Sequence, residues 1–267
     1  MNKEDNSNKL SVIMPALNEE LNISDAISST LEGLDFFKIN GEIIIINDGS
    51  SDRTQFLIEQ KSKENPGRIQ LIKHDKPQGI GASFWEGVDY ATGDFVIMLP
   101  GDNENDPREA LRYYRLLEHV DMVIPFIFNP ETRPFFRNAL SFLYRFIINT
   151  TFLVNFHYTN GTVLYKKSIL KELNYHSSSF FFQADILIRS VKKGYLFAEV
   201  PYKLGMRKKG VSKAVTFPSL YQVSKGYLRL VKDYYFSRDK GQTGIFSSDS
   251  LTAIRRQNAS GESTDNN

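Results

Sequence analysis

The sequence predicts an α/β protein with a mostly parallel central sheet flanked by helices. Four short apolar runs have the length and composition of strands buried on both faces: 10–14, 43–46, 69–72 and 95–99. Helical patterns of about a dozen residues separate these runs, as the crossovers of parallel strands require. The chain of 267 residues is long enough for one large domain or two small ones.

The composition excludes several classes of protein. A formal net charge of +2 gives no overall reason to expect nucleic-acid binding. Cysteine is absent, which excludes disulfides, thiolate nucleophiles and cysteine-ligated zinc. The polar residues 1–9 do not resemble a signal peptide, and no window reaches the roughly 18 apolar residues of a membrane span. We therefore expect a chain that is soluble or lies on a membrane without crossing it.

Polar clusters follow the first two predicted strands. Pro-Ala-Leu-Asn-Glu-Glu at 15–20 leads into an amphipathic segment at 22–36, and Asn-Asp-Gly-Ser-Ser-Asp at 47–52 opens the next helix. Because Asp and Ser are good helix N-caps, capping is the simpler explanation for Asp48 and Asp52 taken alone. Ligands of open parallel sheets bind beyond the carboxyl ends of the strands, however. A third acidic cluster after the fourth strand makes a binding site at this edge the better explanation.

Glycines at 79, 81 and 87 accompany a helix predicted at 81–91. A lone Gly-x-Gly after the third strand is a weak signal, so we reject a nicotinamide cofactor. Glycine also permits close backbone approach, either to a neighbouring strand or to a ligand. The sequence leaves both explanations open.

The fourth strand, Phe95 to Leu99, ends at Pro-Gly and is followed by the acids Asp102, Glu104 and Asp106. Alternate positions of an extended segment allow two or three carboxylates to converge on one hard cation. Mg²⁺ and Mn²⁺ prefer oxygen ligands and commonly bridge a carboxylate to substrate phosphates. An acidic loop that caps a helix starting at Pro107 explains the pattern equally well.

An apolar and acid-free segment at 134–156 is the main feature of the second half. It carries polar residues at four-residue steps, namely Arg137, Ser141, Arg145 and Asn149. On a helix these form one polar stripe, which fits a core helix with a solvated face or a membrane-surface helix that binds a lipid phosphate. A second amphipathic helix, with a basic face, is predicted at 217–235. Strands are expected at 122–126 and 195–200.

Four motifs in order resemble the family 2 glycosyltransferases, which have the GT-A fold. The motifs are Val-Ile-Met-Pro-Ala-Leu-Asn-Glu-Glu at 12–20, Asn-Asp-Gly-Ser-Ser-Asp at 47–52, the three glycines, and Gly-Asp-Asn-Glu at 101–104. Within that family the chain looks most like the polyprenyl (dolichyl) phosphate mannosyltransferases and glucosyltransferases, over about 10–213. We expect the chain to lack the C-terminal transmembrane pair that many of them append.

The resemblance implies a donor site for a nucleotide sugar. It places the base and ribose against Pro15, Leu17, Glu19 and Asp48. Residues 207–213 match the family's Arg-x-x-Gly-x-Ser-Lys loop, in which Arg207 and Lys213 would neutralise the donor diphosphate.

The resemblance also implies Mg²⁺ or Mn²⁺ as cofactor. The family's Asp-x-Asp is matched by Asp102-Asn103-Glu104, with Glu in place of the second Asp. Asp106 stands where some relatives have another metal contact. Asn103 then belongs to the donor site, and Asp102, Glu104 and Asp106 are the predicted metal ligands.

Acceptor residues follow from the same resemblance. Arg133, Arg137 and Ser141 match the residues around the acceptor phosphate of the polyprenyl-phosphate enzymes. Arginine suits this task because its planar fork donates two hydrogen bonds to one phosphate. Asp185 ends a Phe-Gln-x-Asp segment like one beside the acceptor, although it also fits an acid in the first turn of a helix. Asp102, Asp185 and Arg207 are the predicted catalytic residues.

The expected function is an inverting, metal-dependent transfer of a hexose from a GDP- or UDP-sugar to a polyprenyl phosphate. We expect a peripheral protein at the cytoplasmic membrane face, with one GT-A domain at 1–236, a donor half at about 10–126 and an acceptor half at about 127–236. Residues 237–267 form a polar tail, for which we expect disorder beyond about Asp249. The amphipathic helices would lie at the membrane interface.

Other functions stay open. A sugar or lipid hydroxyl as acceptor would need a base, for which Asp185 is the candidate. An inactive GT-A binding protein is a rival reading, because Glu104 and Tyr158 replace the family's usual Asp residues. A nucleotidyltransferase is disfavoured, since no glycine-rich basic loop follows the first strand. The donor's base and sugar, the oligomeric state and a membrane-protein partner are not determined by the sequence.

Overall fold

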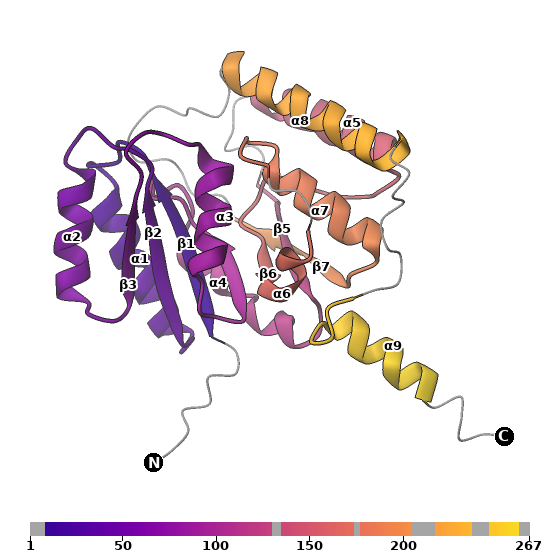
Figure 1. Cartoon of the computed structure of the whole chain (residues 1–267), viewed down its shortest axis with the longest axis horizontal. Helices are drawn as coiled ribbons and strands as arrows, with labels where there is room; N and C mark the ends of the chain where they lie inside the picture. The colour runs from indigo at the N-terminus through magenta and orange to yellow at the C-terminus, as the bar shows by residue number, and fades with distance from the viewer. Residues whose placement is uncertain (1–8, 130–134, 174–176, 204–216, 237–245, 262–267) are drawn as a thin grey trace.

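The computed structural model describes residues 9–129, 135–173, 177–203, 217–236 and 246–261. Its centre is a seven-stranded, mostly parallel sheet with the strand order β3-β2-β1-β4-β6-β5-β7 (Figure 1). The strands are β1 (Leu10–Ala16), β2 (Gly41–Asn47), β3 (Ile69–Lys73), β4 (Phe95–Met98), β5 (Met122–Ile127), β6 (Leu164–Lys166) and β7 (Phe197–Tyr202). The predicted α/β class and its six strands are confirmed, and β6 is an addition.

Strand direction places most carboxyl ends at one edge. β1 pairs in parallel with β2 and β4, β2 with β3, and β5 with β7. The short β6 is antiparallel to both β4 and β5. Two antiparallel steps restore the original direction, so β5 and β7 end at the same edge as β1, β2 and β4.

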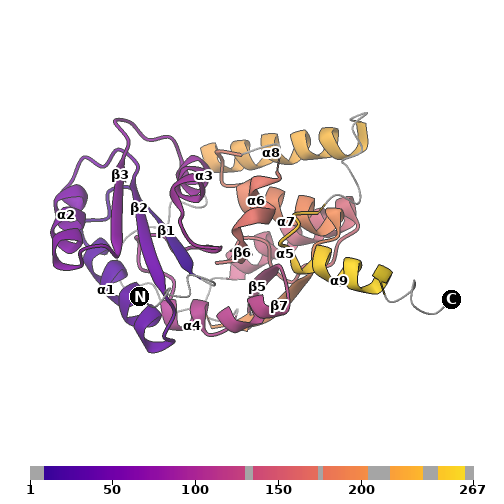
Figure 2. The same cartoon turned by 60° about the horizontal axis from the view of Figure 1, so that its bottom comes forward.

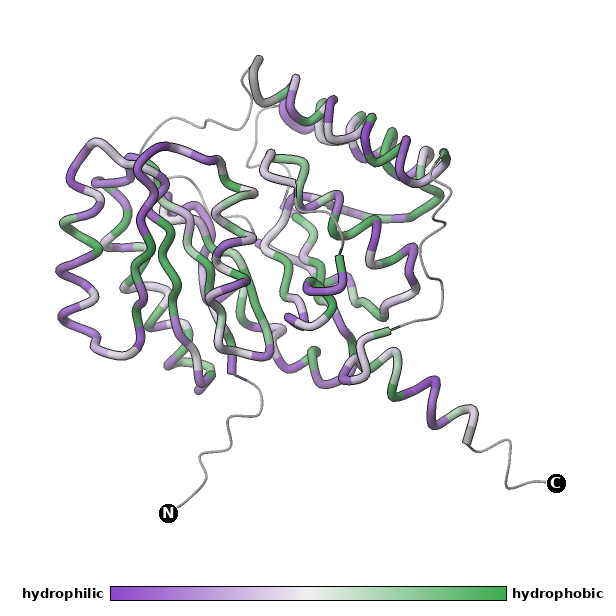
Figure 3. Tube along the Cα trace, in the orientation of Figure 1, coloured by the Kyte–Doolittle hydropathy of each residue, from purple (hydrophilic) through white to green (hydrophobic). Residues whose placement is uncertain are grey.

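Helices cover both faces of the sheet. They are α1 (Ile23–Phe36), α2 (Thr54–Glu64), α3 (Ile80–Tyr90), α4 (Pro107–Leu111), the 3₁₀ helix η1 (Tyr114–Glu118), α5 (Phe135–Phe152), α6 (Lys167–Lys171), α7 (Phe182–Lys193), α8 (Phe217–Phe236) and α9 (Leu251–Gly261). The parallel strands are hydrophobic along most of their length, whereas the helices alternate between polar and apolar residues (Figure 3). The central strands β1 and β4 are buried throughout, as expected of strands covered on both faces, whereas the edge strands β3 and β7 are partly exposed.

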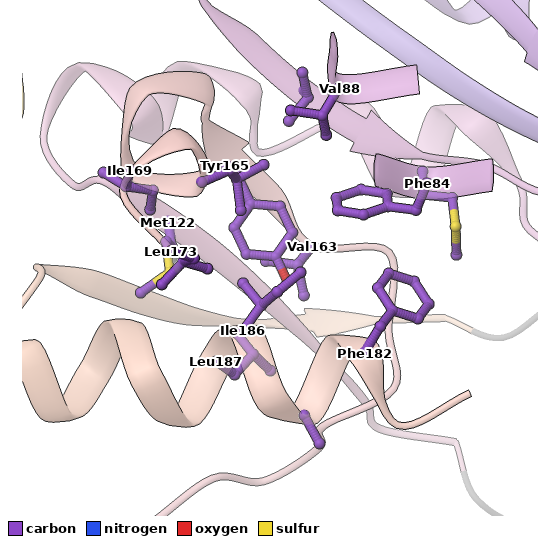
Figure 4. Packing of buried hydrophobic residues seen from close by; sticks show 14 of the residues in the cluster. Phe84, Val88, Met122, Val163, Tyr165, Ile169, Leu173, Phe182, Ile186 and Leu187 are labelled. Atoms are coloured by element: carbon purple, nitrogen blue, oxygen red, sulfur yellow. The ribbon is translucent and has the colours of Figure 1, made fainter. Parts of the chain in front are cut away.

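Two apolar cores result from the alternation of side chains along the strands. Ile13 packs in the core under α3 and α7, whereas Val12 and Met14 pack in the core under α1 and α4. All three side chains are fully buried, and each contributes about 1.5–3 kcal/mol through burial. On the α3 side, the ring of Phe84 lies 5.0 Å from Phe182 and 6.3 Å from Tyr165 between ring centroids (Figure 4).

Glycines on α3 permit close approach within the protein itself. A Cβ at Gly87 would lie 2.5 Å from Cγ2 of Ile13 on β1, and a Cβ at Gly81 would lie 2.3 Å from the carbonyl oxygen of Ser177. The Gly81 amide donates to the carbonyl of Ser178 over 3.1 Å. Packing against a strand and against a loop therefore explains these glycines.

In the view of Figure 1, α8 lies in front of α5, and both run above α7. The hydroxyls of Thr151 and Tyr227 are 2.8 Å apart and join the two helices. Large apolar side chains of both helices face outward, including Phe142 at 61% and Leu228 at 64% exposure. Within the described ranges, no helix combines the length and hydrophobicity needed to cross a membrane.

The C-terminal segment differs from the expected disorder, because residues 251–261 form α9. The buried Asp121 accepts hydrogen bonds from the amides of Leu251 and Thr252 and from the Thr252 hydroxyl. This carboxylate therefore caps the start of α9, although Asp121 directly precedes β5 and lies more than a hundred residues earlier in the chain. Composition alone does not reveal such a distant cap. The rest of the helix projects from the domain (Figures 1 and 2).

Candidate active site

The predicted donor residues meet at the carboxyl edge of β1, β2 and β4. The amide of Asp48 donates to Ala16 and the amide of Gly101 donates to Pro15, each over 2.9 Å. Pro15 therefore lies in β1 with the Asp48 turn on one side and the acidic loop on the other. Leu17 follows in the turn after β1 and is half-buried.

The turn after β1 is held against the turn after β2. The Glu19 amide donates to Thr54 Oγ1 over 2.8 Å, and the Glu19 carboxylate accepts from Asn22 Nδ2 over 2.9 Å. Asn18 has a left-handed backbone with φ of 55° and accepts from the Ser51 amide. Asp52 accepts from the amide of Thr54 at the start of α2, so helix capping explains Asp52.

Asp48 is buried, and its carboxylate is hydrogen-bonded by groups of the chain itself. Its carboxylate accepts from the amides of Gln78 and Gly79, over 2.7 and 2.9 Å. It also contacts Nδ1 of His74 at 2.6 Å. The carboxylate thus orients the turn that leads into α3, and its predicted contact with the base or ribose stays a prediction.

The acidic loop after β4 does not gather three carboxylates. The Glu104 amide donates to Asp102 Oδ1 over 3.1 Å, and Asn103 has a left-handed φ of 55°. Asp106 accepts from the amide of Arg108 and caps α4. In the described residues, no three His, Asp or Glu side chains form a group that could hold a metal. The capping alternative holds for Asp106, while Asp102 and Glu104 remain the predicted metal ligands.

Acceptor candidates lie at the start of α5. Arg137 and Ser141 are half-buried on that helix, whereas Arg133 lies outside the described residues. Further along α5, Arg145 donates to the carbonyl of His157 over 2.8 Å and borders a cavity of about 310 Å³. α5 begins eight residues after β5, whose carboxyl end lies at the same edge of the sheet as those of β1, β2 and β4.

Asp185 lies in the first turn of α7, with its side chain only 3% exposed. Arg189 Nε donates to its carboxylate over 3.0 Å, and Arg189 Nη2 donates to Asp233 of α8 over 2.8 Å. Burial raises the pKa of Asp185 to about 6, although Arg189 acts in the opposite direction. Gln183 donates to the carbonyl of Gly161 over 2.7 Å and fixes the start of the helix. Arg207 and Lys213 lie outside the described residues.

Sequence reasoning missed His74 and Glu86. The two ring nitrogens of His74 contact Asp48 and Glu86, and the side chain is 3% exposed. Burial, the largest single influence, lowers the pKa of His74, but the hydrogen bonds that the ring donates to the two carboxylates and their negative charges raise it overall. A lone histidine just after a strand is a weak signal, and only the fold brings it between two acids.

A sequence model described as "Glycosyl transferase family 2" matches residues 11–174. The chain is 27% identical over 206 residues to an undecaprenyl-phosphate 4-deoxy-4-formamido-L-arabinose transferase of Edwardsiella ictaluri, a match that covers 76% of this chain and 62% of that protein. It is 23% identical over 244 residues to a dodecaprenyl-phosphate galacturonate synthase of Rhizobium johnstonii, covering 89% and 70%. The chain thus spans less than two thirds of the first of these relatives.

The structure resembles that of glucosyl-3-phosphoglycerate synthase from Mycobacterium tuberculosis. The complex with Mn²⁺, UDP and glucosyl-3-phosphoglycerate matches with a TM-score of 0.63 and 17% identity, over 85% of this chain and 79% of that one. The complex of the same protein with Mg²⁺ and UDP matches with a TM-score of 0.62 and 15% identity, with the same coverage. These matches show a common GT-A fold.

Proposed function

Because the chain belongs to glycosyl transferase family 2, we propose that it is an inverting enzyme that moves a hexose from a GDP- or UDP-sugar to a polyprenyl phosphate. The observation that carries the proposal is the contact between the predicted donor half and the predicted acceptor half at one edge of the sheet. The turns that follow β1, β2 and β4 lie at this edge, and Gly81 at the start of α3 contacts Ser178 just before α7. The names of both curated relatives, which act on prenyl phosphates, support the choice of acceptor.

The donor nucleotide is assigned to the turns after β1 and β2, with Pro15, Leu17, Glu19 and Asp48 as its proposed contacts. Asn103 would lie beside the diphosphate. Arg207 and Lys213 would neutralise the diphosphate charge as the sugar leaves, the step that most needs electrostatic help. The M. tuberculosis synthase, which has the same fold, binds UDP.

A divalent cation fits the acidic loop after β4. Carboxylates are hard oxygen donors of the kind that Mg²⁺ and Mn²⁺ prefer, and a site with few protein ligands leaves positions for diphosphate oxygens. We assign the cation to Asp102 and Glu104, because the Asp106 carboxylate already caps α4. When bound, the cation would stabilise negative charge on the leaving diphosphate.

The acceptor phosphate is assigned to Arg133, Arg137 and Ser141. A phosphate monoester is anionic at neutral pH, so the transfer requires no strong base, and these residues would orient it for in-line attack. Exposed apolar side chains on α5 and α8 suit a surface that meets lipid, as a polyprenyl acceptor requires. We place the protein peripherally at the cytoplasmic membrane face.

Transfer to a sugar or lipid hydroxyl is the second candidate. The observation that favours it is Asp185, a buried carboxylate whose pKa is raised to about 6 by burial, near the range of a general base. Asp185→Asn should nearly abolish transfer to a hydroxyl but only reduce transfer to a phosphate. Arg137→Ala should have the opposite pattern.

A panel of GDP- and UDP-sugars, offered with polyprenyl phosphate and Mn²⁺, tests the proposal by product mass. We expect one donor to add a single hexose to the lipid phosphate, and Asp102→Ala to remove the activity. Labelling of a hydroxyl acceptor with no labelling of the lipid phosphate would show that the proposal is wrong.

A further inference from the structure

His74 lies just after β3, between two carboxylates from different parts of the fold. Its Nδ1 is 2.6 Å from Oδ1 of Asp48 after β2, and its Nε2 contacts Oε2 of Glu86 on α3. The imidazole is 3% exposed, and Glu86 provides the partly open side of the cluster with 34% exposure. The ring thus bridges the end of β2 to the second turn of α3.

The geometry determines the charge of His74. An ionised carboxylate only accepts hydrogen bonds, so a ring nitrogen that faces one must carry a proton. Both nitrogens face carboxylates, and both are therefore satisfied only in the imidazolium. The raised pKa of His74 has the same physical cause. A neutral ring would leave one nitrogen lone pair against a carboxylate oxygen.

The imidazolium is part of a larger unit that shapes the donor edge. Asp48 accepts from the amides of Gln78 and Gly79 in addition to His74. Gly49 fits closely here, because a Cβ at that position would lie 2.9 Å from the backbone of Lys76 and Pro77. Loss of the His74 contact would therefore loosen Asp48 and the turn that precedes α3 together.

We propose that charged His74 is a positioning residue for the nucleotide: it holds Asp48 and the Gln78–Gly79 turn in the arrangement to which the donor binds. This inference rests on the proposed function, in which Asp48 contacts the nucleotide. The charged groups that face or adjoin His74 are Asp48 just after β2, Glu86 from α3, and its chain neighbours Lys73 and Asp75. Lys73 is itself paired with Glu59 of α2 at 2.7 Å.

Binding of the donor should consequently depend on pH. Nucleotide affinity should fall as pH rises through the pKa of His74, because the neutral ring no longer bridges both carboxylates. Glu86→Gln should remove this fall, since the new amide can donate to Nε2 of a neutral ring while Nδ1 still donates to Asp48. At low pH, where His74 of the wild type is charged, His74→Gln should bind nucleotide roughly tenfold more weakly than the wild type, because a side-chain amide cannot donate at both ends. This difference should shrink as pH rises and the wild-type ring becomes neutral.

The experiment is isothermal titration of the full chain with UDP and with GDP, in the presence of Mg²⁺, from pH 6 to pH 8.5. His119→Gln is the matched control, because His119 is exposed and remote from β2 and α3. The control also reports the titration of the nucleotide phosphates, which all variants share. Circular dichroism and thermal unfolding verify that each variant folds, and Glu86→Gln keeps the test decisive if His74→Gln does not fold.

Nitrogen-15 chemical shifts provide a second measurement that does not involve nucleotide. The chain has four histidines, so the His74 ring is assigned by its loss in His74→Gln. We expect imidazolium shifts for His74 at pH 7, where an ordinary histidine is mostly neutral.

The outcomes separate this inference from the proposed function. A wild type that binds UDP or GDP, with equal affinity and pH profile in His74→Gln and the His119 control, would overturn the role of His74 alone. The same holds for a neutral His74 ring at pH 7 in the nitrogen spectra. Binding of neither nucleotide by the wild type would overturn the proposed function and this inference with it.

Discussion

Arg189 of α7 donates to Asp233 of α8 over 2.8 Å, and through this contact the predicted catalytic residue Asp185 is linked to α8. Gly226 brings the same two elements close, because a Cβ there would lie 2.9 Å from the side chain of Phe181. A movement of α8 on a lipid surface would therefore also displace the start of α7. The first prediction tests this connection.

Removal of the Arg189 guanidinium should destabilise the protein. Arg189→Met keeps much of the side-chain packing but leaves the buried Asp185 carboxylate without this charged donor. We expect a loss of about 1–3 kcal/mol in the free energy of unfolding, measured with urea. Asp233→Asn is the comparison variant and should lose less than about 1 kcal/mol, because Asp233 is 36% exposed. Equal losses of unfolding free energy in the two variants would contradict a larger stabilising role for the buried Asp185–Arg189 pair than for the Arg189–Asp233 pair.

Stability should depend on pH through Asp185. Its pKa is raised by burial to about 6 in the folded protein, above the ordinary value of 3.8. The folded state therefore binds more protons than the unfolded state between about pH 4 and pH 6. The contribution of Asp185 to the free energy of unfolding is consequently fully present below about pH 4 and is lost as pH rises through about 6. Urea titrations at pH 4, 5, 6 and 7 should show this decline in the wild type relative to Asp185→Asn. A constant difference between the two proteins across that range would contradict the prediction.

Gly87→Ala tests the approach of α3 to β1. In a helix without tertiary contacts this change stabilises by roughly 1 kcal/mol. Here the new methyl would lie 2.5 Å from Cγ2 of Ile13, so we expect a net loss of about 1–3 kcal/mol in the free energy of unfolding. Asp89→Ala, an exposed position of the same helix, is the control and should change little. A more stable Gly87→Ala variant would show that α3 can move away from the sheet.

Asp121→Asn should release the start of α9. The carboxylate accepts from the Leu251 amide over 2.7 Å and from the Thr252 amide over 3.2 Å. We expect hydrogen exchange of these two amides to become at least about tenfold faster, since each loses a charged acceptor. Asp249→Asn, at an exposed position, provides the control. Unchanged exchange at 251 and 252 would mean that other contacts hold the helix.

The outer surface of α5 should bind membranes. Phe142 and Phe146 are 61% and 58% exposed on the helix that carries Arg137. Their joint replacement by Ser should weaken sedimentation with phosphatidylglycerol-containing vesicles by more than about tenfold, because each ring would otherwise be buried in lipid. Ile254→Ser on α9 is an exposed apolar control that should leave vesicle binding unchanged. Equal binding by all three proteins would exclude α5 as the lipid contact.

The apolar runs and their spacing determined the strands β1 to β5 and β7, the helices between them and the edge at which a site would form. These are local properties, since a buried parallel strand and an amphipathic helix each have their own period of hydrophobicity. The short β6 was missed because three residues carry too little pattern to be recognised. The polar composition after 237 concealed α9, whose cap comes from Asp121.

Tertiary structure decided what the polar residues do. Asp52 and Asp106 cap helices, Asp48 orients the start of α3, and Asp185 is paired through Arg189 to α8. His74 acquires its charge only between Asp48 and Glu86, whose positions in the chain are 26 residues before and 12 residues after it. Hydrophobic periodicity reports how each segment is buried, but a buried polar group depends on partners that chain order does not reveal.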